Sequence, residues 1–189
     1  MLENYKILLG SGSPRRKQML EELGISFTIS KKEVEETYPE DIEKDKVAEF
    51  LAVKKADAFI ETLKTDELVI TADTTVVVEN TILGKASGVE EAKGMLNLLS
   101  GRDHYVYTGV CIKSIEKTIS FTSSTKVYFK ELREEEIDYY IKEYKPFDKA
   151  GAYGIQEWIG MIGIEKIEGS YFNVVGLPVQ RLYSELLKY

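Results

Sequence analysis

The stretch Lys6-Ile-Leu-Leu-Gly-Ser-Gly-Ser-Pro-Arg-Arg-Lys-Gln-Met-Leu-Glu-Glu-Leu23 decides how this chain begins to fold. Residues 6–9 form a short run of mostly apolar residues, which predicts a strand. Apolar residues then recur at helical spacing up to Gly24, a residue typical of a helix end. Small residues fill the loop between the two segments. A strand, a loop of small residues and a helix therefore follow one another, as in the first unit of an α/β fold.

The loop Ser11-Gly-Ser-Pro-Arg-Arg16 has the composition of an anion-binding site. Ser13 is placed as an N-cap and Pro14 as the first helical residue, so free backbone N–H groups at the helix start face the loop. Glycines allow close approach of a phosphate, the serines supply hydroxyl groups, and Arg15 and Arg16 supply forked donors. We predict a phosphate site, with a well-capped helix carrying two surface arginines as the alternative. No Gly-Lys-Ser/Thr sequence ends the loop, so it is not a Walker A motif.

Strand-like and helix-like segments alternate along the rest of the chain, without a repeat or a Pro/Gly/Ser-rich linker. Strands are predicted at 68–78, 81–83, 105–115, 118–129 and 161–167, and helices at 17–23, 46–63, 89–99, 134–144 and 177–187. Asp45 is predicted to cap the second helix, and Ser87 with Glu90 to form a capping box for the third. We predict a single domain over residues 1–189, of α/β class, with a mixed and largely antiparallel sheet flanked by helices.

The composition excludes several common classes of protein. Cys111 and His104 are the single cysteine and histidine, so the chain has no internal disulfide, no zinc site built from His/Cys clusters, and no Ser-His-Asp triad without His104. Cys111 lies in an apolar segment and is interpreted as a core residue, not a nucleophile. A net charge of −7 argues against nucleic-acid binding. Residues 1–9 contain no signal segment or membrane span, which predicts a cytoplasmic protein that does not bind membranes.

Asp73 is a carboxylate within the apolar, β-branched run 68–78. Because burying a carboxylate costs free energy unless it has a partner, we predict that Asp73 acts as a general base or as a ligand of a divalent cation. The alternative is an aspartate satisfied by neighbouring N–H groups at a bend in the strand. Two further segments of small residues, 148–156 and 169–178, are predicted either to contact a ligand or to form structural turns.

Taken in this order, the motifs resemble the Maf proteins over nearly the whole chain. The resemblance is carried by Ser11-Gly-Ser-Pro-Arg-Arg16, Ala72-Asp73-Thr74, Leu83-Gly-Lys85 and the segments 100–110, 148–156 and 169–178. It implies an inosine-triphosphatase-like (Maf/HAM) fold of two lobes with a nucleotide cleft between them, and a homodimer. It also implies a hydrolase that cleaves nucleoside triphosphates to monophosphate and pyrophosphate, with a house-cleaning role and a link to septum formation.

The resemblance further implies roles for individual residues. Asp73 is expected to accept a proton from the attacking water, and Glu36 and Asp73 to hold a divalent metal, Mg²⁺ by default with Mn²⁺ or Co²⁺ as alternatives. The residues expected to bind phosphate are Ser11, Ser13, Arg15, Arg16, Lys55 and Lys85. Arg15, Thr74 and Gln156 resemble the trio of the dTTP/UTP subgroup, so canonical or modified pyrimidine triphosphates are the expected substrates.

Three residues depart from the family pattern, and none of them removes a catalytic group. Gly10 stands where alanine is usual, Ala86 where proline is usual and Arg133 where a Thr or Ser cap is usual. Ala86 is expected to loosen the loop that presents Lys85, because proline would restrict that loop. Two alternatives remain open: a non-catalytic, nucleotide-binding regulator of septum formation, and a pyrophosphatase of the same fold specific for 7-methyl-GTP.

Overall fold

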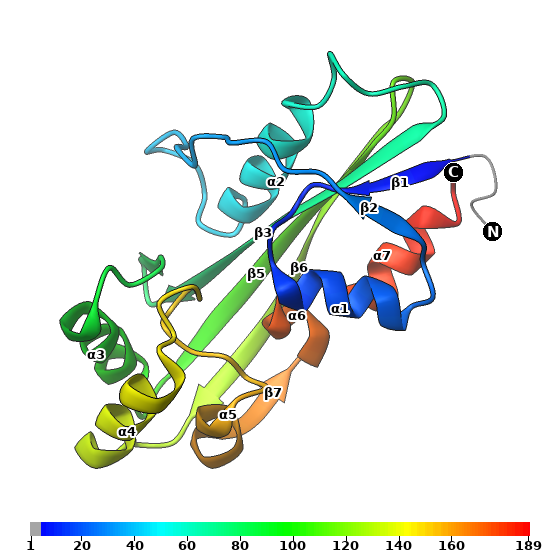
Figure 1. Cartoon of the computed structure of the whole chain (residues 1–189). Helices are drawn as coiled ribbons and strands as arrows, with labels where there is room; N and C mark the ends of the chain where they lie inside the picture. The colour runs from blue at the N-terminus through cyan, green and yellow to red at the C-terminus, as the bar shows by residue number, and fades with distance from the viewer. Residues whose placement is uncertain (1–4) are drawn as a thin grey trace. The chain divides into compact units, whose positions relative to one another are not determined.

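The computed structural model describes residues 5–189 (Figure 1), so the prediction made from residues 1–9 lies partly outside the described residues. The strands are β1 (Lys6–Leu9), β2 (Phe27–Ile29), β3 (Glu67–Val78), β4 (Thr81–Leu83), β5 (Asp103–Lys113), β6 (Thr118–Phe129) and β7 (Ile164–Glu168). The helices are α1 (Pro14–Glu22), α2 (Val47–Asp57), α3 (Val89–Leu99), α4 (Glu134–Tyr144), α5 (Trp158–Gly163), α6 (Tyr171–Val175) and α7 (Val179–Leu186). Among these described helices, none is both long and apolar enough to cross a membrane.

The strands form one mixed sheet in the order β2-β1-β3-β5-β6-β7, with β4 paired to β3. β1 runs parallel to both of its neighbours, with Leu9 opposite Ile70 of β3. The β3–β4 and β6–β7 pairs are antiparallel, and residues 114–117 join β5 directly to its neighbour β6, a connection short enough only for an antiparallel pair. The sheet is therefore mainly antiparallel, and the predicted α/β class is confirmed.

The chain divides into two compact units, each made of several segments. The first unit comprises residues 1–73, 108–123 and 176–189, and the second comprises residues 74–107 and 124–175. β3, β5 and β6 each contribute residues to both units. The predicted single domain over residues 1–189 stays a prediction.

In the first unit, helix α2 is fixed on the sheet by backbone contact. The hydroxyl of Thr71 donates a 2.6 Å hydrogen bond to the carbonyl of Ala52. A Cβ added at Gly109 would lie 2.2 Å from the backbone of Ala48 and Glu49, so the helix touches β5 directly. Glu49 accepts hydrogen bonds from two hydroxyls of β6 at 2.7 Å. These contacts set the position of the last turn of α2, which carries Lys55.

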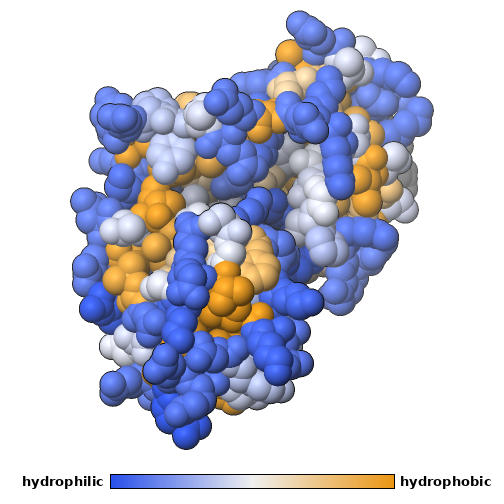
Figure 2. All heavy atoms as spheres, turned by 60° about the vertical axis from the view of Figure 1, so that its left-hand side comes forward, coloured by the Kyte–Doolittle hydropathy of each residue, from blue (hydrophilic) through white to orange (hydrophobic). Residues whose placement is uncertain are grey.

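The second unit has a hydrophobic core of its own, formed where α3, α4 and α5 cover their strands. Its fully buried residues include Leu96, Leu99, Ile137, Tyr140 and Ile159. On the face seen in Figure 2, hydrophilic side chains cover most of the surface and hydrophobic side chains gather in smaller areas between them. The buried Cys111 belongs to a cluster in the first unit, and burial raises the pKa of its thiol to about 12, which confirms a core residue.

Several predicted element boundaries and caps are wrong. The N-cap of α2 is Lys46 without a side-chain cap, so Asp45 does not cap the helix. The N-cap of α3 is Gly88, and the Ser87 hydroxyl donates to Glu91. The predicted strand 161–167 begins as helix α5, because a short apolar run does not distinguish a helix from a strand. The prediction also missed β2 and α6, which are too short to show a period.

Candidate active site

The loop before α1 adopts the predicted capped geometry. The Ser13 hydroxyl accepts a 3.4 Å hydrogen bond from the backbone N–H of Arg16, and Pro14 is the first helical residue. The Ser11 hydroxyl accepts a bond of 3.2 Å from the Ser13 backbone. The predicted N-cap is confirmed, and the hydroxyls and N–H groups that could face an anion lie together in this loop.

Arg16 ties three segments of the first unit together. Its Nε donates to the carbonyl of Gly176 at 2.8 Å, and its Nη1 donates to the carbonyl of Ala72 at 2.8 Å and to the Ser11 hydroxyl at 3.3 Å. Burial lowers the pKa of this guanidinium, while the charge of Asp73 acts in the opposite direction. Arg16 thus holds the loop against the residue that precedes Asp73.

A further cation, Lys31, lies over the loop and was not predicted. A Cβ added at Gly12 would lie 2.6 Å from Cε and 2.7 Å from Nζ of Lys31, so the lysine occupies the space that the glycine leaves open. The half-buried Arg15 stands at the start of α1 in the same unit. No periodicity or motif in the sequence distinguishes Lys31 from other surface lysines.

Asp73, Lys55 and Glu36 form one cluster of charges in the first unit. The ammonium of Lys55 lies 2.5 Å from Oδ1 of Asp73 and 2.7 Å from Oε1 of Glu36. The side chains of Asp73 and Lys55 are 13% and 17% exposed, whereas that of Glu36 is 48% exposed. β3 continues through Asp73 without a break, and 73–74 is a half-buried step between the buried runs 68–72 and 75–78. The carboxylate is partnered by Lys55 and so is not an aspartate at a strand bend.

The two carboxylates of this cluster suit a divalent cation. Both lie within hydrogen-bond distance of a single nitrogen atom, so their oxygens converge on one position. Within residues 5–189, no group of three or more His, Cys, Asp or Glu side chains is arranged to hold a metal. Mg²⁺ is commonly held by one or two carboxylates, with substrate phosphates and waters as its other ligands. Glu36 and Asp73 therefore fit such a cation together with a bound phosphate.

The remaining predicted residues lie in the second unit. Thr74 is half-buried on β3, and Lys85 and Gln156 are exposed. The loop of Lys85 is held by an isolated β-bridge to Ala150 and by a 3.0 Å hydrogen bond from Gly151 N–H to the carbonyl of Gly84. Backbone pairing thus restrains this loop although proline is absent from it.

His104 is buried in the second unit and does not form a hydrolytic triad. Its Nε2 lies 2.7 Å from the hydroxyl of Tyr153, and its ring stacks on Phe129 with the centroids 5.5 Å apart. Burial lowers the pKa of His104 to about 4. The imidazole is therefore neutral at pH 7 and supports the segment that leads to Gln156.

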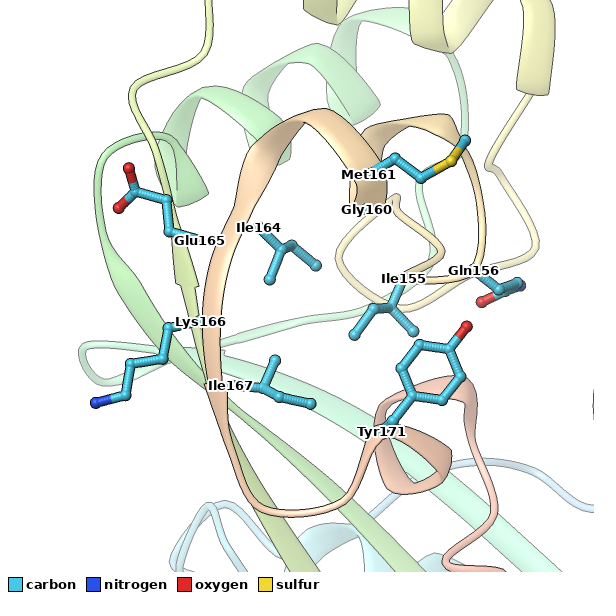
Figure 3. Close-up of a pocket in the computed structure, with 9 residues that line it drawn as sticks. All are labelled: Ile155, Gln156, Gly160, Met161, Ile164, Glu165, Lys166, Ile167 and Tyr171. Atoms are coloured by element: carbon cyan, nitrogen blue, oxygen red, sulfur yellow. The ribbon is translucent and has the colours of Figure 1, made fainter.

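A pocket of about 400 Å³ lies beside Gln156 in the second unit (Figure 3). Its lining residues are Ile155, Gln156, Gly160, Met161, Ile164, Glu165, Lys166, Ile167 and Tyr171. In Figure 3 the isoleucines fill the middle of the view, and the charged ends of Glu165 and Lys166 point away from them. Gln156 and Tyr171 are the uncharged polar residues of this lining, and in Figure 3 the amide of Gln156 points away from the isoleucines.

Comparison with known proteins gives matches along the whole chain. The sequence profile of a family described as Maf-like protein matches residues 6–189. The chain is 52% identical over 188 residues to a dTTP/UTP pyrophosphatase of Phocaeicola vulgatus, covering 99% of this chain and 97% of that protein. It is 47% identical over 188 residues to a dTTP/UTP pyrophosphatase of Bacteroides thetaiotaomicron, with 99% and 97% coverage.

Among solved structures, the chain is similar to the Ham1 protein of Staphylococcus aureus. The TM-score is 0.54 at 17% sequence identity, and the match covers 97% of this chain and 98% of that one. At this identity the likeness concerns the fold alone. It confirms the fold class predicted from the sequence.

Proposed function

The chain belongs to the Maf family, and from this premise we propose that it is a nucleoside triphosphate pyrophosphatase that hydrolyses dTTP and UTP. The products are the nucleoside monophosphate and pyrophosphate. The observation that carries the proposal is the convergence of Asp73, Lys55 and Glu36 on one position in the unit that also contains the capped serine-glycine loop. The similarity to relatives named dTTP/UTP pyrophosphatase supports the choice of pyrimidine substrates.

In this reaction water attacks the α-phosphorus, and the bond from that phosphorus to the oxygen bridging the β-phosphate breaks. Asp73 accepts a proton from the attacking water, and pyrophosphate leaves with the bond electrons. A divalent cation held by Glu36 and Asp73 would neutralise charge on the phosphate oxygens. The N–H groups at the start of α1, the hydroxyls of Ser11 and Ser13, and Arg15 bind the phosphates.

Two lysines complete the assigned phosphate contacts. Lys55 is held by the two carboxylates in the structure, and a bound triphosphate offers its ammonium additional oxygen partners. The side chain of Lys85 is exposed and can reach a bound triphosphate, while the backbone of its loop is restrained by pairing with Ala150. We assign Arg16 a second role, because its bonds to Gly176, Ala72 and Ser11 fix the loop as well.

We assign the choice of base to Arg15, Thr74 and Gln156. The amide of Gln156 provides both a donor and an acceptor, which is what the edge of a uracil or thymine ring requires. The pocket beside Gln156 adds apolar surface against which a flat ring can pack. Mg²⁺ as the metal, a homodimer, a cytoplasmic location and a link to septum formation stay predictions from the sequence.

The proposal is tested by measuring pyrophosphate release from dTTP, UTP, CTP, GTP, 7-methyl-GTP and ITP with Mg²⁺ or Mn²⁺, and again after chelation with EDTA. We expect turnover of dTTP and UTP with either metal, loss of turnover in EDTA, and a fall in kcat of at least about 100-fold in Asp73→Asn, because the proton acceptor is gone. Asp66→Asn is the matched control, since Asp66 lies in the same unit and pairs with Lys6 at 2.8 Å.

Two outcomes would change the proposal. Cleavage of 7-methyl-GTP in preference to UTP would keep the proposed reaction and replace the proposed pyrimidine substrates by 7-methyl-GTP. Binding of nucleotides without any turnover would overturn the proposed enzymatic activity. It would leave the alternative of a non-catalytic, nucleotide-binding regulator of septum formation.

A further inference from the structure

Gln156 stands on a tight turn whose backbone closes on itself. The N–H of Glu157 donates to the carbonyl of Gly154 at 3.0 Å, so Gln156 is the third residue of a four-residue turn. The side chain of Gln156 is exposed, whereas residues 151–155 before it are buried. The position of the amide of Gln156 therefore depends on how firmly this turn is held.

One hydroxyl group joins both ends of the turn. The hydroxyl of Tyr140 accepts a 3.0 Å hydrogen bond from the backbone N–H of Gly154 and donates to Oε2 of Glu157. Tyr140 lies on α4, and its ring is fully buried in the core of the second unit. The hydroxyl oxygen of Tyr140 thus links both ends of the turn to the core, in addition to the buried side chain of Ile155 within the turn.

Glu157 is also held by a buried lysine. Its Oε1 lies 3.1 Å from Nζ of Lys149, which in turn lies 2.7 Å from Oδ1 of Asp148. The side chains of Lys149 and Glu157 are 10% and 19% exposed, so the pair is largely shielded from water. Burial and the charge of Glu157 raise the pKa of Tyr140, and its hydroxyl keeps its proton and remains a donor.

We propose that Tyr140 and Glu157 are positioning residues that fix the Gln156 turn and thereby set discrimination between nucleobases. This inference rests on the proposed function, because it takes Gln156 as the group that reads the base. Neither residue needs to touch the substrate. Their contribution is to hold the donor and acceptor of the Gln156 amide in one place, since a hydrogen-bond pattern distinguishes uracil from cytosine only when it cannot shift to suit either base.

The direct test is Tyr140→Phe, which removes the bridging oxygen and keeps the buried ring. We expect KM for UTP to rise about tenfold and the preference for UTP over CTP in kcat/KM to fall by a similar factor, with kcat for UTP changing less than about twofold. The backbone N–H of Gly154 should also exchange with deuterium faster, because it loses its acceptor. Tyr144→Phe is the matched control, on the same helix with its ring stacked on Tyr140 at 5.1 Å.

Substitutions at Glu157 separate positioning from general loss of stability. Glu157→Ala should reproduce the loss of base preference, whereas Glu157→Gln should restore it to within about twofold, because the amide oxygen still accepts from the Tyr140 hydroxyl. If Tyr140→Phe and Glu157→Ala instead lower kcat/KM for UTP and CTP by the same factor, with a lower Tm, the two residues have a purely structural role. That result would overturn the inference.

The inference and the proposed function fail in different ways. An active wild type whose base preference survives Tyr140→Phe overturns the inference alone. A wild type that cleaves none of the nucleotides overturns the proposed function, whatever the exchange rate of Gly154 shows.

Discussion

The Glu36–Lys55–Asp73 cluster and the Gln156 turn are held by opposite means. The cluster consists of charged side chains that share one ammonium, and one of its members, Glu36, is half exposed. The turn is held by backbone groups, a buried hydroxyl and a shielded ion pair. The exposed carboxylate of Glu36 can move when a phosphate or a cation arrives, whereas the buried hydrogen bonds of the turn resist change because an unmade bond is costly. We therefore expect the first region to adjust to ligands and the second to stay in place.

The largest effect should come from Lys55→Met, which removes the shared ammonium. We expect kcat/KM for UTP to fall about 100-fold, because the cation proposed to stabilise the phosphates is lost. We also expect half-saturation at an Mg²⁺ concentration about tenfold lower, because the two carboxylates no longer pair with the lysine. Mg²⁺ titrations of the activity would check both. Lys54→Met is the control, since Lys54 bonds to Thr37 at 2.9 Å. An unchanged Mg²⁺ requirement would show that the ammonium and the metal do not compete.

The second unit should respond to acid through His104. Its pKa is about 4 in the folded chain against 6.5 ordinarily, so the unfolded chain binds the proton more readily between these values. The contribution of His104 to stability is therefore fully present above pH 6.5 and falls by on the order of 3 kcal/mol as the pH decreases through 4. Nδ1 of His104 has no hydrogen-bond partner within the described part of the chain, which explains why the protonated ring is disfavoured.

Urea denaturation at several pH values would measure this dependence in wild type and in His104→Gln. The variant should be less stable at pH 7, because the stacking on Phe129 is lost, and should have a flatter profile between pH 6.5 and 4. Parallel profiles for the two proteins would assign the acid sensitivity to another group.

A smaller effect is expected for Gly10→Ala, at the start of the predicted phosphate loop. A Cβ there would lie 2.7 Å from Cγ2 of Thr71, so we expect a loss of about 1 kcal/mol in the free energy of unfolding. Thr71→Ser removes that methyl group and keeps the hydroxyl that binds Ala52, and the double variant should recover most of the loss. If the losses in the free energy of unfolding are additive in the double variant, the strain does not arise from the contact between position 10 and the methyl group of Thr71. Recovery in the double variant would attribute the departure at Gly10 to the neighbouring threonine rather than to Phe59 or Val69, which an added Cβ would approach at 3.2 and 3.3 Å.

The parts of the site that could be predicted from the sequence are those with a local physical cause. Ser13 and Pro14 satisfy the start of one helix within a few residues, and Asp73 is conspicuous because it is a charge in an apolar strand. The roles of Glu36 and Lys55 came from resemblance, and the structure brings both to Asp73. Those roles themselves stay predictions.

The remaining features depend on contacts between distant parts of the chain. Arg16 binds Gly176, 160 residues away, and no spacing rule connects them. Glu157 and Tyr140 meet because α4 packs against the turn, so neither residue is distinctive in the sequence. The predicted strand 161–167 includes the last turn of α5 as well as most of β7, because a short apolar run does not separate the two. Gly160 fits closely in this helix, with an added Cβ only 1.9 Å from the carbonyl oxygen of Ile155.

The contact at Gly109 limits how this site can change over evolutionary time. Since the backbone of α2 rests on that residue, any side chain there would lift the helix and move Lys55 away from Asp73. The atoms that a side chain at Gly109 would meet are backbone atoms of Ala48 and Glu49, which cannot move aside as the end of a flexible side chain can. Gly109 has no side chain and takes no part in any chemistry, yet the position of Lys55 depends on it. A search for reactive groups would therefore pass over one of the residues on which the inherited site depends most strictly.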